Sequence, residues 1–116
     1  MRVLVCGSRS IKNFAYVRDC INQSGFEIDT IIEGQAKGVD TLARIYALAY
    51  KIPFEEYPAD WDTYGKRAGF IRNEEMVKIC DGVIAIWDGK STGTAHTISL
   101  AKKYKKELVI FRRLEF

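Results

Sequence analysis

The sequence predicts an α/β protein, a single small Rossmann-like domain with a five-stranded parallel sheet flanked by helices. Three observations support this fold class. Five short apolar runs rich in Val and Ile are spaced along the chain, and segments with helical spacing lie between them. The alternation of strand and helix is uninterrupted, which is typical of a parallel sheet with helices on both faces. The apolar runs do not alternate with polar residues, as expected of strands buried on both sides.

The elements follow in order. The predicted strands are residues 3–6, 30–32, 54–57, 83–87 and 108–111. Asn13 is placed to cap a first helix over residues 14–24, which ends at Gly25. A second helix carries Leu42, Ile45, Tyr46 and Ala49 on one stripe. A third covers about residues 67–80 and a fourth about residues 94–104.

Composition indicates one globular domain over residues 1–116. Hydrophobic residues make up 47% of the chain and charged residues 28%, which are ordinary globular values. Cys6, Cys20 and Cys80 are widely spaced, and we expect buried free thiols, no metal site and no cofactor. No apolar run is long enough to span a membrane. We therefore expect a soluble cytoplasmic protein.

Residues suited to ligand binding follow the predicted strands. In an open parallel sheet the ligand site lies beyond the carboxyl ends of the strands. Glycines there allow the backbone to approach a ligand closely, and the N-termini of the following helices offer N–H groups to a phosphate. The fragment Gly89-Lys90-Ser91 lacks the earlier glycine of a P-loop, because position 84 is Ile84. The loop through Ser91, Thr92, Gly93 and Thr94 is still predicted to bind phosphate, although a simple turn before a helix is the alternative.

The third helix carries an unusual stripe. Gly69, Arg72, Asn73 and Met76 share one face, so two polar residues lie beside residues expected to pack inward. Arg72 is predicted to contact a carboxylate or phosphate at the sheet edge. A solvated arginine is the alternative.

Four segments resemble a known family. They are CGSRS after the first strand, EGQAKGVDTLA after the second, YPADWDTYGKRAGFIRNEEM after the third and IWDGKSTGTAHTI after the fourth. Together they are similar to the YspA-like branch of the SLOG superfamily, which includes the DprA proteins and the lonely-guy phosphoribohydrolases. The resemblance implies a nucleotide or nucleotide-derived ligand, and dimers are frequent in the superfamily. It implies a site lined by Gly7, Ser8, Arg9, Gly34, Gly38, Asp40, Gly93 and Thr94, with Arg72 and Asn73 facing it.

The sequence departs from the lonely-guy enzymes where those enzymes carry glutamates. Ala95, His96 and Thr97 follow the Gly-Thr pair here. The resemblance therefore supports binding better than catalysis, and we expect little release of base from nucleoside monophosphates. Candidate catalytic groups are Asp88, Asp40 and His96, the single histidine. Asp88 is also a candidate for ribose binding, and each of the three has a structural alternative as a cap, turn or surface residue.

Three functions remain open. The leading hypothesis is a protein that binds a nucleotide-like small molecule as a sensor or processing protein, and a homodimer is possible. The alternatives are a phosphoribohydrolase-type enzyme that cleaves an N-glycosidic bond and a DNA-associated DprA-like protein. Trp61 and Tyr64 are candidates for stacking on a base, or for packing. The net charge of +3 is small and no basic face interleaved with aromatic residues is evident, so nucleic acid is not an expected partner.

Overall fold

Parallel pairing orders the five strands as β3-β2-β1-β4-β5 in the computed structural model. The structure describes residues 1–113, so the end of the predicted domain, residues 114–116, lies outside the described residues. The strands are β1 (Arg2–Gly7), β2 (Thr30–Glu33), β3 (Phe54–Glu56), β4 (Gly82–Trp87) and β5 (Glu107–Arg112). The helices are α1 (Phe14–Gln23), α2 (Val39–Ala49), α3 (Trp61–Tyr64), the 3-10 turn η1 (Gly65–Arg67), α4 (Ala68–Ile79) and α5 (Thr92–Lys103). The predicted fold class is confirmed.

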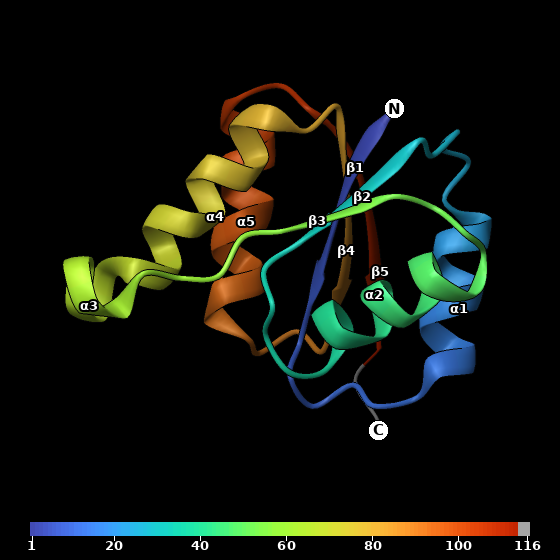
Figure 1. Cartoon of the computed structure of the whole chain (residues 1–116), viewed down its shortest axis with the longest axis horizontal. Helices are drawn as coiled ribbons and strands as arrows, with labels where there is room; N and C mark the ends of the chain where they lie inside the picture. The colour runs from blue at the N-terminus through green and yellow to red at the C-terminus, as the bar shows by residue number, and fades with distance from the viewer. Residues whose placement is uncertain (114–116) are drawn as a thin grey trace.

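Helices cover both faces of the sheet (Figure 1). Successive side chains of a strand point to opposite faces, so one strand contributes to two separate cores. Val3 and Val5 of β1 pack into the cluster shared with α1 and α2, whereas Leu4 and Cys6 pack into the cluster shared with α4 and α5. All four side chains are buried. This two-sided burial explains why the central strands lack polar alternation.

The edge strands differ from the expectation of burial on both faces. β3 is half-buried along its length, and β5 consists of exposed and half-buried residues with none buried. Each has a strand neighbour on one side only. Their short apolar runs therefore predicted strands correctly but overstated how deeply those strands lie.

The predicted helix boundaries hold within one or two residues, with one addition. Asn13 caps α1 by accepting a hydrogen bond from the Tyr16 N–H at 3.1 Å. The segment before α4, expected as a loop, forms the short helix α3, which Asp60 caps. In Figure 1 α3 projects away from the sheet beyond α4.

The strand order reverses between β1 and β4. The chain first builds outward from β1 to β2 and β3, then crosses to β4 and β5 on the other side. Crevices at such a switch point are the usual ligand sites of open α/β sheets. At this place Gly7 pairs with Ile86, and a Cβ on Gly7 would approach the Val39 side chain to 2.5 Å. Glycine is therefore required for α2 to begin directly against the end of β1.

Cys6, Cys20 and Cys80 are buried and free, as the sequence predicted. Within residues 1–113 no group of three or more His, Cys, Asp or Glu side chains is arranged to hold a metal ion. None of the helices formed by these residues has the length and apolar character needed to cross a membrane.

Candidate functional site

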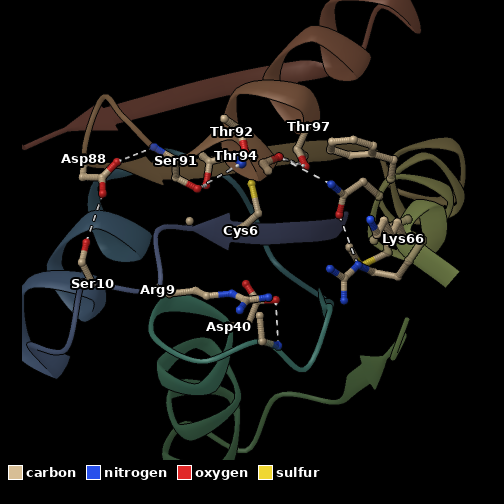
Figure 2. Close-up of a pocket in the computed structure, with 18 of the residues that line it drawn as sticks. Cys6, Arg9, Ser10, Asp40, Lys66, Asp88, Ser91, Thr92, Thr94 and Thr97 are labelled. Atoms are coloured by element: carbon tan, nitrogen blue, oxygen red, sulfur yellow. Dashed lines mark hydrogen bonds between the residues drawn. The ribbon is translucent and has the colours of Figure 1, made fainter. Parts of the chain in front are cut away.

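A cavity of about 580 Å³ opens at the carboxyl end of β1, among the loops before α2 and α5 and the first half of α4 (Figure 2). Its volume falls in the usual range for small-molecule sites. The cavity is lined by Cys6, Gly7, Arg9, Ser10, Ala36, Asp40, Trp61, Lys66, Gly69, Phe70, Arg72, Asn73, Met76, Asp88, Ser91, Thr92, Gly93, Thr94 and Thr97.

Most of the residues predicted to bind ligand line this cavity. They are Gly7, Arg9, Asp40, Arg72, Asn73, Asp88, Ser91, Thr92, Gly93 and Thr94. Their role in binding remains a prediction. Ser8, Gly34 and Gly38 do not line the cavity. Ser8 is fully buried and its hydroxyl oxygen accepts a hydrogen bond from the Asp88 N–H at 2.9 Å, which ties the loop after β1 to the loop after β4.

Gly38 supports the site from outside the cavity. It precedes α2 with a φ of 77°, and a Cβ there would meet the Ser8 carbonyl oxygen at 2.5 Å. Residues with a Cβ rarely adopt this φ. The glycine therefore lets the loop before α2 approach the loop after β1, which holds Arg9 at the cavity wall.

The N-terminus of α5 faces the cavity. The helix begins at Thr92, two residues earlier than predicted, with Ser91 as its N-cap. The Ser91 hydroxyl accepts from the Thr94 N–H and from the Thr94 hydroxyl, at 3.5 and 3.2 Å. The N–H groups of Thr92 and Gly93 have no acceptor within the described part of the chain. A helix N-terminus with free N–H groups and adjacent hydroxyls is suited to an anion.

Asp88 holds the turn that leads into α5. One carboxylate oxygen accepts hydrogen bonds from the Lys90 and Ser91 N–H groups, both at 2.8 Å, and the other accepts from the Ser10 hydroxyl at 3.1 Å. These backbone donors lower the pKa of Asp88 to about 2. The carboxylate is therefore ionised at neutral pH and engaged in shaping the loop, which favours the structural alternative for this residue.

Asp40 and Arg72 meet at the loop after β2. The Asp40 carboxylate accepts from the Gly34 and Ala36 N–H groups at 3.1 and 3.2 Å. Arg72 donates to the Gly34 carbonyl from Nη1 and to the Asn73 side chain from Nε. Burial raises the pKa of Asp40, while the Ala36 N–H and then Arg72 act against that rise. The sequence also allowed an Asp40 pair with Arg44, and no such ion pair forms among the described residues.

Two other cations line the cavity without such partners. Arg9 and Lys66 make no hydrogen bond and no ion pair within residues 1–113. In Figure 2 Arg9 lies below Cys6, on the side opposite Ser91 and Thr92. The positive charge of these side chains is therefore available to a ligand. Lys66 was not among the predicted ligand-binding residues, although in the sequence it lies just before the helix that carries Arg72.

Aromatic side chains form the outer wall. Trp61 and Phe70 line the cavity and are exposed, at 54% and 49%. The Trp61 ring covers Gly69, where an added Cβ would lie 3.6 Å from it. Tyr64, Lys66 and Arg67 lie between them in the chain and are also exposed. The segment 61–70 thus groups exposed aromatic and basic side chains, with the exposed acid Asp62 among them. This grouping was not predicted, because it extends over α3, η1 and the start of α4.

His96 does not line the main cavity. Its ring packs on Phe70 with centroids 4.5 Å apart, and its Nδ1 lies 3.4 Å from Asn73 Nδ2. Burial lowers the pKa of His96. Within residues 1–113 no hydrogen bond joins any two of the catalytic candidates Asp40, Asp88 and His96. Their arrangement therefore adds nothing to the case for catalysis.

Glu33, at the end of β2, is a further acid at this edge of the sheet, and it is buried. Its side chain is fully buried, Oε2 accepts from the Gln35 N–H at 3.0 Å, and Oε1 has no hydrogen-bond partner. Burial, followed by contact with Glu56, raises the pKa of Glu33 to about 8. The group is thus mostly protonated at neutral pH, in contrast to Asp88, whose pKa is lowered.

The fold and the site define a Rossmann-like protein with an anion-suited cavity at the switch point of its sheet. Residues 1–64, more than half of the chain, match the family described as YspA, cpYpsA-related SLOG family. The Gene 61 protein of Mycobacterium phage D29 is 34% identical over 112 residues, which cover 88% of this chain and 89% of that protein. The chain belongs to the YspA, cpYpsA-related SLOG family.

Two solved structures share the fold. DNA processing protein A (DprA) from Streptococcus pneumoniae matches with a TM-score of 0.77 and 22% identity, over 94% of this chain and 49% of that one. DprA from Helicobacter pylori matches with a TM-score of 0.67 and 21% identity, over 95% of this chain and 64% of that one. The chain therefore spans about half and about two thirds of these DprA chains.

One prediction about partners is wrong. Nucleic acid was not expected, because the net charge is small and no basic face with aromatic residues was evident. The Helicobacter pylori protein is described by its single-stranded DNA binding mode, so the shared fold is found in a protein with a nucleic-acid partner. The sequence argument failed because net charge averages over the whole surface, whereas the exposed segment 61–70 concentrates aromatic and basic side chains at the cavity.

Proposed function

We propose that this protein binds a nucleotide unit of single-stranded DNA in the cavity at the end of β1. One observation is the main support for the proposal. The free N–H groups of α5 and the unpaired cations Arg9 and Lys66 lie across the same cavity from one another. A phosphate placed there would accept hydrogen bonds from both sides.

The aromatic wall fits the other half of the ligand. Proteins that bind single strands combine a basic groove with exposed aromatic rings on which bases stack. Trp61 and Phe70 provide such rings beside the phosphate site, and the similarity to the DprA proteins favours a nucleotide that is part of a strand.

A free nucleotide-derived ligand is the second candidate. The cavity volume of about 580 Å³ suits a single nucleotide, and binding of such a ligand by the same phosphate site would describe a sensor or nucleotide-processing protein. The two candidates differ in whether affinity requires more than one nucleotide.

The test is fluorescence anisotropy with labelled (dT)20, alongside calorimetry with dTMP, AMP and ADP-ribose. Arg9→Ala and Lys66→Ala should each weaken strand binding by about tenfold or more, because each removes a charge-assisted contact. Each should also reduce the slope of log affinity against log salt by roughly 0.7, the value for one phosphate contact on a single strand. Lys102→Ala, at the far end of α5, is the matched control for lost charge.

The outcomes separate the candidates. Tight binding of (dT)20 with weak binding of the mononucleotides and ADP-ribose supports single-stranded DNA as the ligand. Tight binding of those small molecules with weak binding of (dT)20 supports a free nucleotide-derived ligand. If Arg9→Ala and Lys66→Ala bind every probe as the parent does, the cavity is not the site.

A further inference from the structure

A second cavity, of about 440 Å³, adjoins the first on the outer face of α4 and α5. It is lined by Arg67, Phe70, Ile71, Glu74, Glu75, Lys78 and His96. Phe70 lines both cavities, and the contact between Asn73 and His96 joins a residue of the first to a residue of the second. The two cavities are therefore neighbours that share the Phe70 side chain.

The charge of the second cavity is balanced, unlike that of the first. The positive charges of Arg67 and Lys78 are balanced by the negative charges of Glu74 and Glu75. Glu74 Oε1 forms an ion pair with Lys78 Nζ at 3.4 Å. Such a lining does not concentrate positive charge, so a phosphate would gain little by entering it. A flat, neutral group with hydrogen-bond donors at its edge fits better.

Two rings provide a stacking surface for such a group. The Phe70 ring is 49% exposed and packs at a tilt on His96, whose pKa is lowered by burial so that its neutral form is favoured. Glu74 lines the same cavity as the two rings, and its charge acts against the lowering of the His96 pKa by burial. A carboxylate is an acceptor only, so it selects a base that presents N–H groups.

We propose that the second cavity is the subsite for a neighbouring base of the same ligand and that Glu74 makes it selective for guanine. Guanine presents two adjacent donors, N1–H and the N2 amino group, to one carboxylate, whereas thymine presents a single donor flanked by acceptors. The inference rests on the proposed function, because it requires a phosphate in the first cavity.

Two consecutive basic residues connect the two proposed subsites. Lys66 lines the first cavity and Arg67, the next residue, lines the second, both on η1. Arg67 makes no hydrogen bond and no ion pair within residues 1–113. Consecutive cations, one lining each cavity, suit the phosphodiester that links two nucleotides.

The test measures binding of the 5′-phosphorylated dinucleotides d(TpT), d(GpT), d(TpG) and their hypoxanthine analogues by calorimetry. One guanine dinucleotide should bind about tenfold more tightly than d(TpT), in line with the energy of a bidentate base contact, and hypoxanthine, which lacks the amino group, should fall between them. Glu74→Gln should remove the preference, because it weakens binding of the guanine dinucleotide more than binding of d(TpT). Glu27→Gln makes the same charge change at the opposite end of the sheet and should keep the preference.

The possible negative results contradict either the second subsite alone or the proposed function as well. Equal binding of all dinucleotides by the parent, or a guanine preference that survives in Glu74→Gln, overturns the second subsite alone. Binding of no dinucleotide and no longer strand overturns the proposed function as well. If Phe70→Leu instead converts a dimer to a monomer in sedimentation velocity, the second cavity is an interface between copies and the base subsite is wrong.

Discussion

Arg72 on α4 donates a hydrogen bond from Nη1 to the backbone carbonyl oxygen of Gly34, 38 positions earlier in the chain, at 2.5 Å. The contact joins the helix to the loop after β2. Arg72 also lines the cavity and is half-buried, with Asp40 close enough to oppose the lowering of its pKa by burial. One side chain thus holds the loop and presents charge to the site.

Arg72→Ala should therefore reduce both stability and binding. Loss of a hydrogen bond from a charged donor costs about 1.5–3 kcal/mol, and the Gly34 carbonyl would lose its partner. Arg72→Lys should recover only part, since an ammonium group does not reproduce the guanidinium fork. Urea unfolding measures the change. Arg18→Ala, which breaks an exposed pair with Asp19, is the control and should cost less than 1 kcal/mol. Equal effects at both positions would show that Arg72 is an ordinary surface residue.

The fold was predictable because its evidence is local. Val3 and Val5 pack in one core, and Leu4 and Cys6 pack in the other. The sequence of β1 is therefore a continuous apolar run, which predicts a buried strand without knowledge of the tertiary structure. Capping by Asn13 and Asp60 also depends on side chains within three residues. By contrast, the half-burial of β3 and β5 follows from strand order, which the sequence does not state.

The residues that line the cavity could be predicted where neighbouring residues in the sequence determine their position. They were missed where tertiary structure brings them to the cavity. Gly93 and Thr94 follow a buried strand, so their place at a helix N-terminus could be inferred. Lys66 and Phe70 reach the cavity only because α3 and η1 orient the start of α4 over it. The contact of Ser8 with ligand remains a prediction. Ser8 is fully buried and forms hydrogen bonds with Ile86 and Asp88 at the end of β4.

Gly38→Ala should lower stability more than Gly25→Ala. Both glycines have positive φ, 77° and 81°, which residues with a Cβ rarely adopt, so each alanine is strained. At Gly25 the added Cβ meets open space, whereas at Gly38 it meets the Ser8 carbonyl oxygen at 2.5 Å. The difference between the two free energies of unfolding reports the clash together with the ψ of −125° at Gly38. Equal losses would mean that the loop before α2 relaxes freely.

Gly93→Val should abolish binding without unfolding the protein. A Cβ at Gly93 has no heavy atom within 4 Å apart from its helical neighbours, so the larger side chain enters the cavity and meets no wall. There it would occupy the space predicted for phosphate. Ser99→Val places the same residue on the exposed side of α5 and controls for the helix propensity of valine. A folded Gly93→Val protein, judged by circular dichroism, that binds labelled (dT)20 or nucleotides as the parent does would refute the phosphate site.

Glu33→Gln should change how stability depends on pH. Burial, reinforced by Glu56, raises the folded-state pKa of Glu33 to about 8 from an ordinary value of 4.5. The unfolded chain releases the proton first, so the contribution of Glu33 is full below about pH 4.5 and is lost as pH rises to about 8. Glutamine carries no charge, so the variant should gain stability over the parent across this window, as measured by urea unfolding from pH 5 to 9. Parallel pH profiles would mean that Glu33 is already ionised in the folded protein.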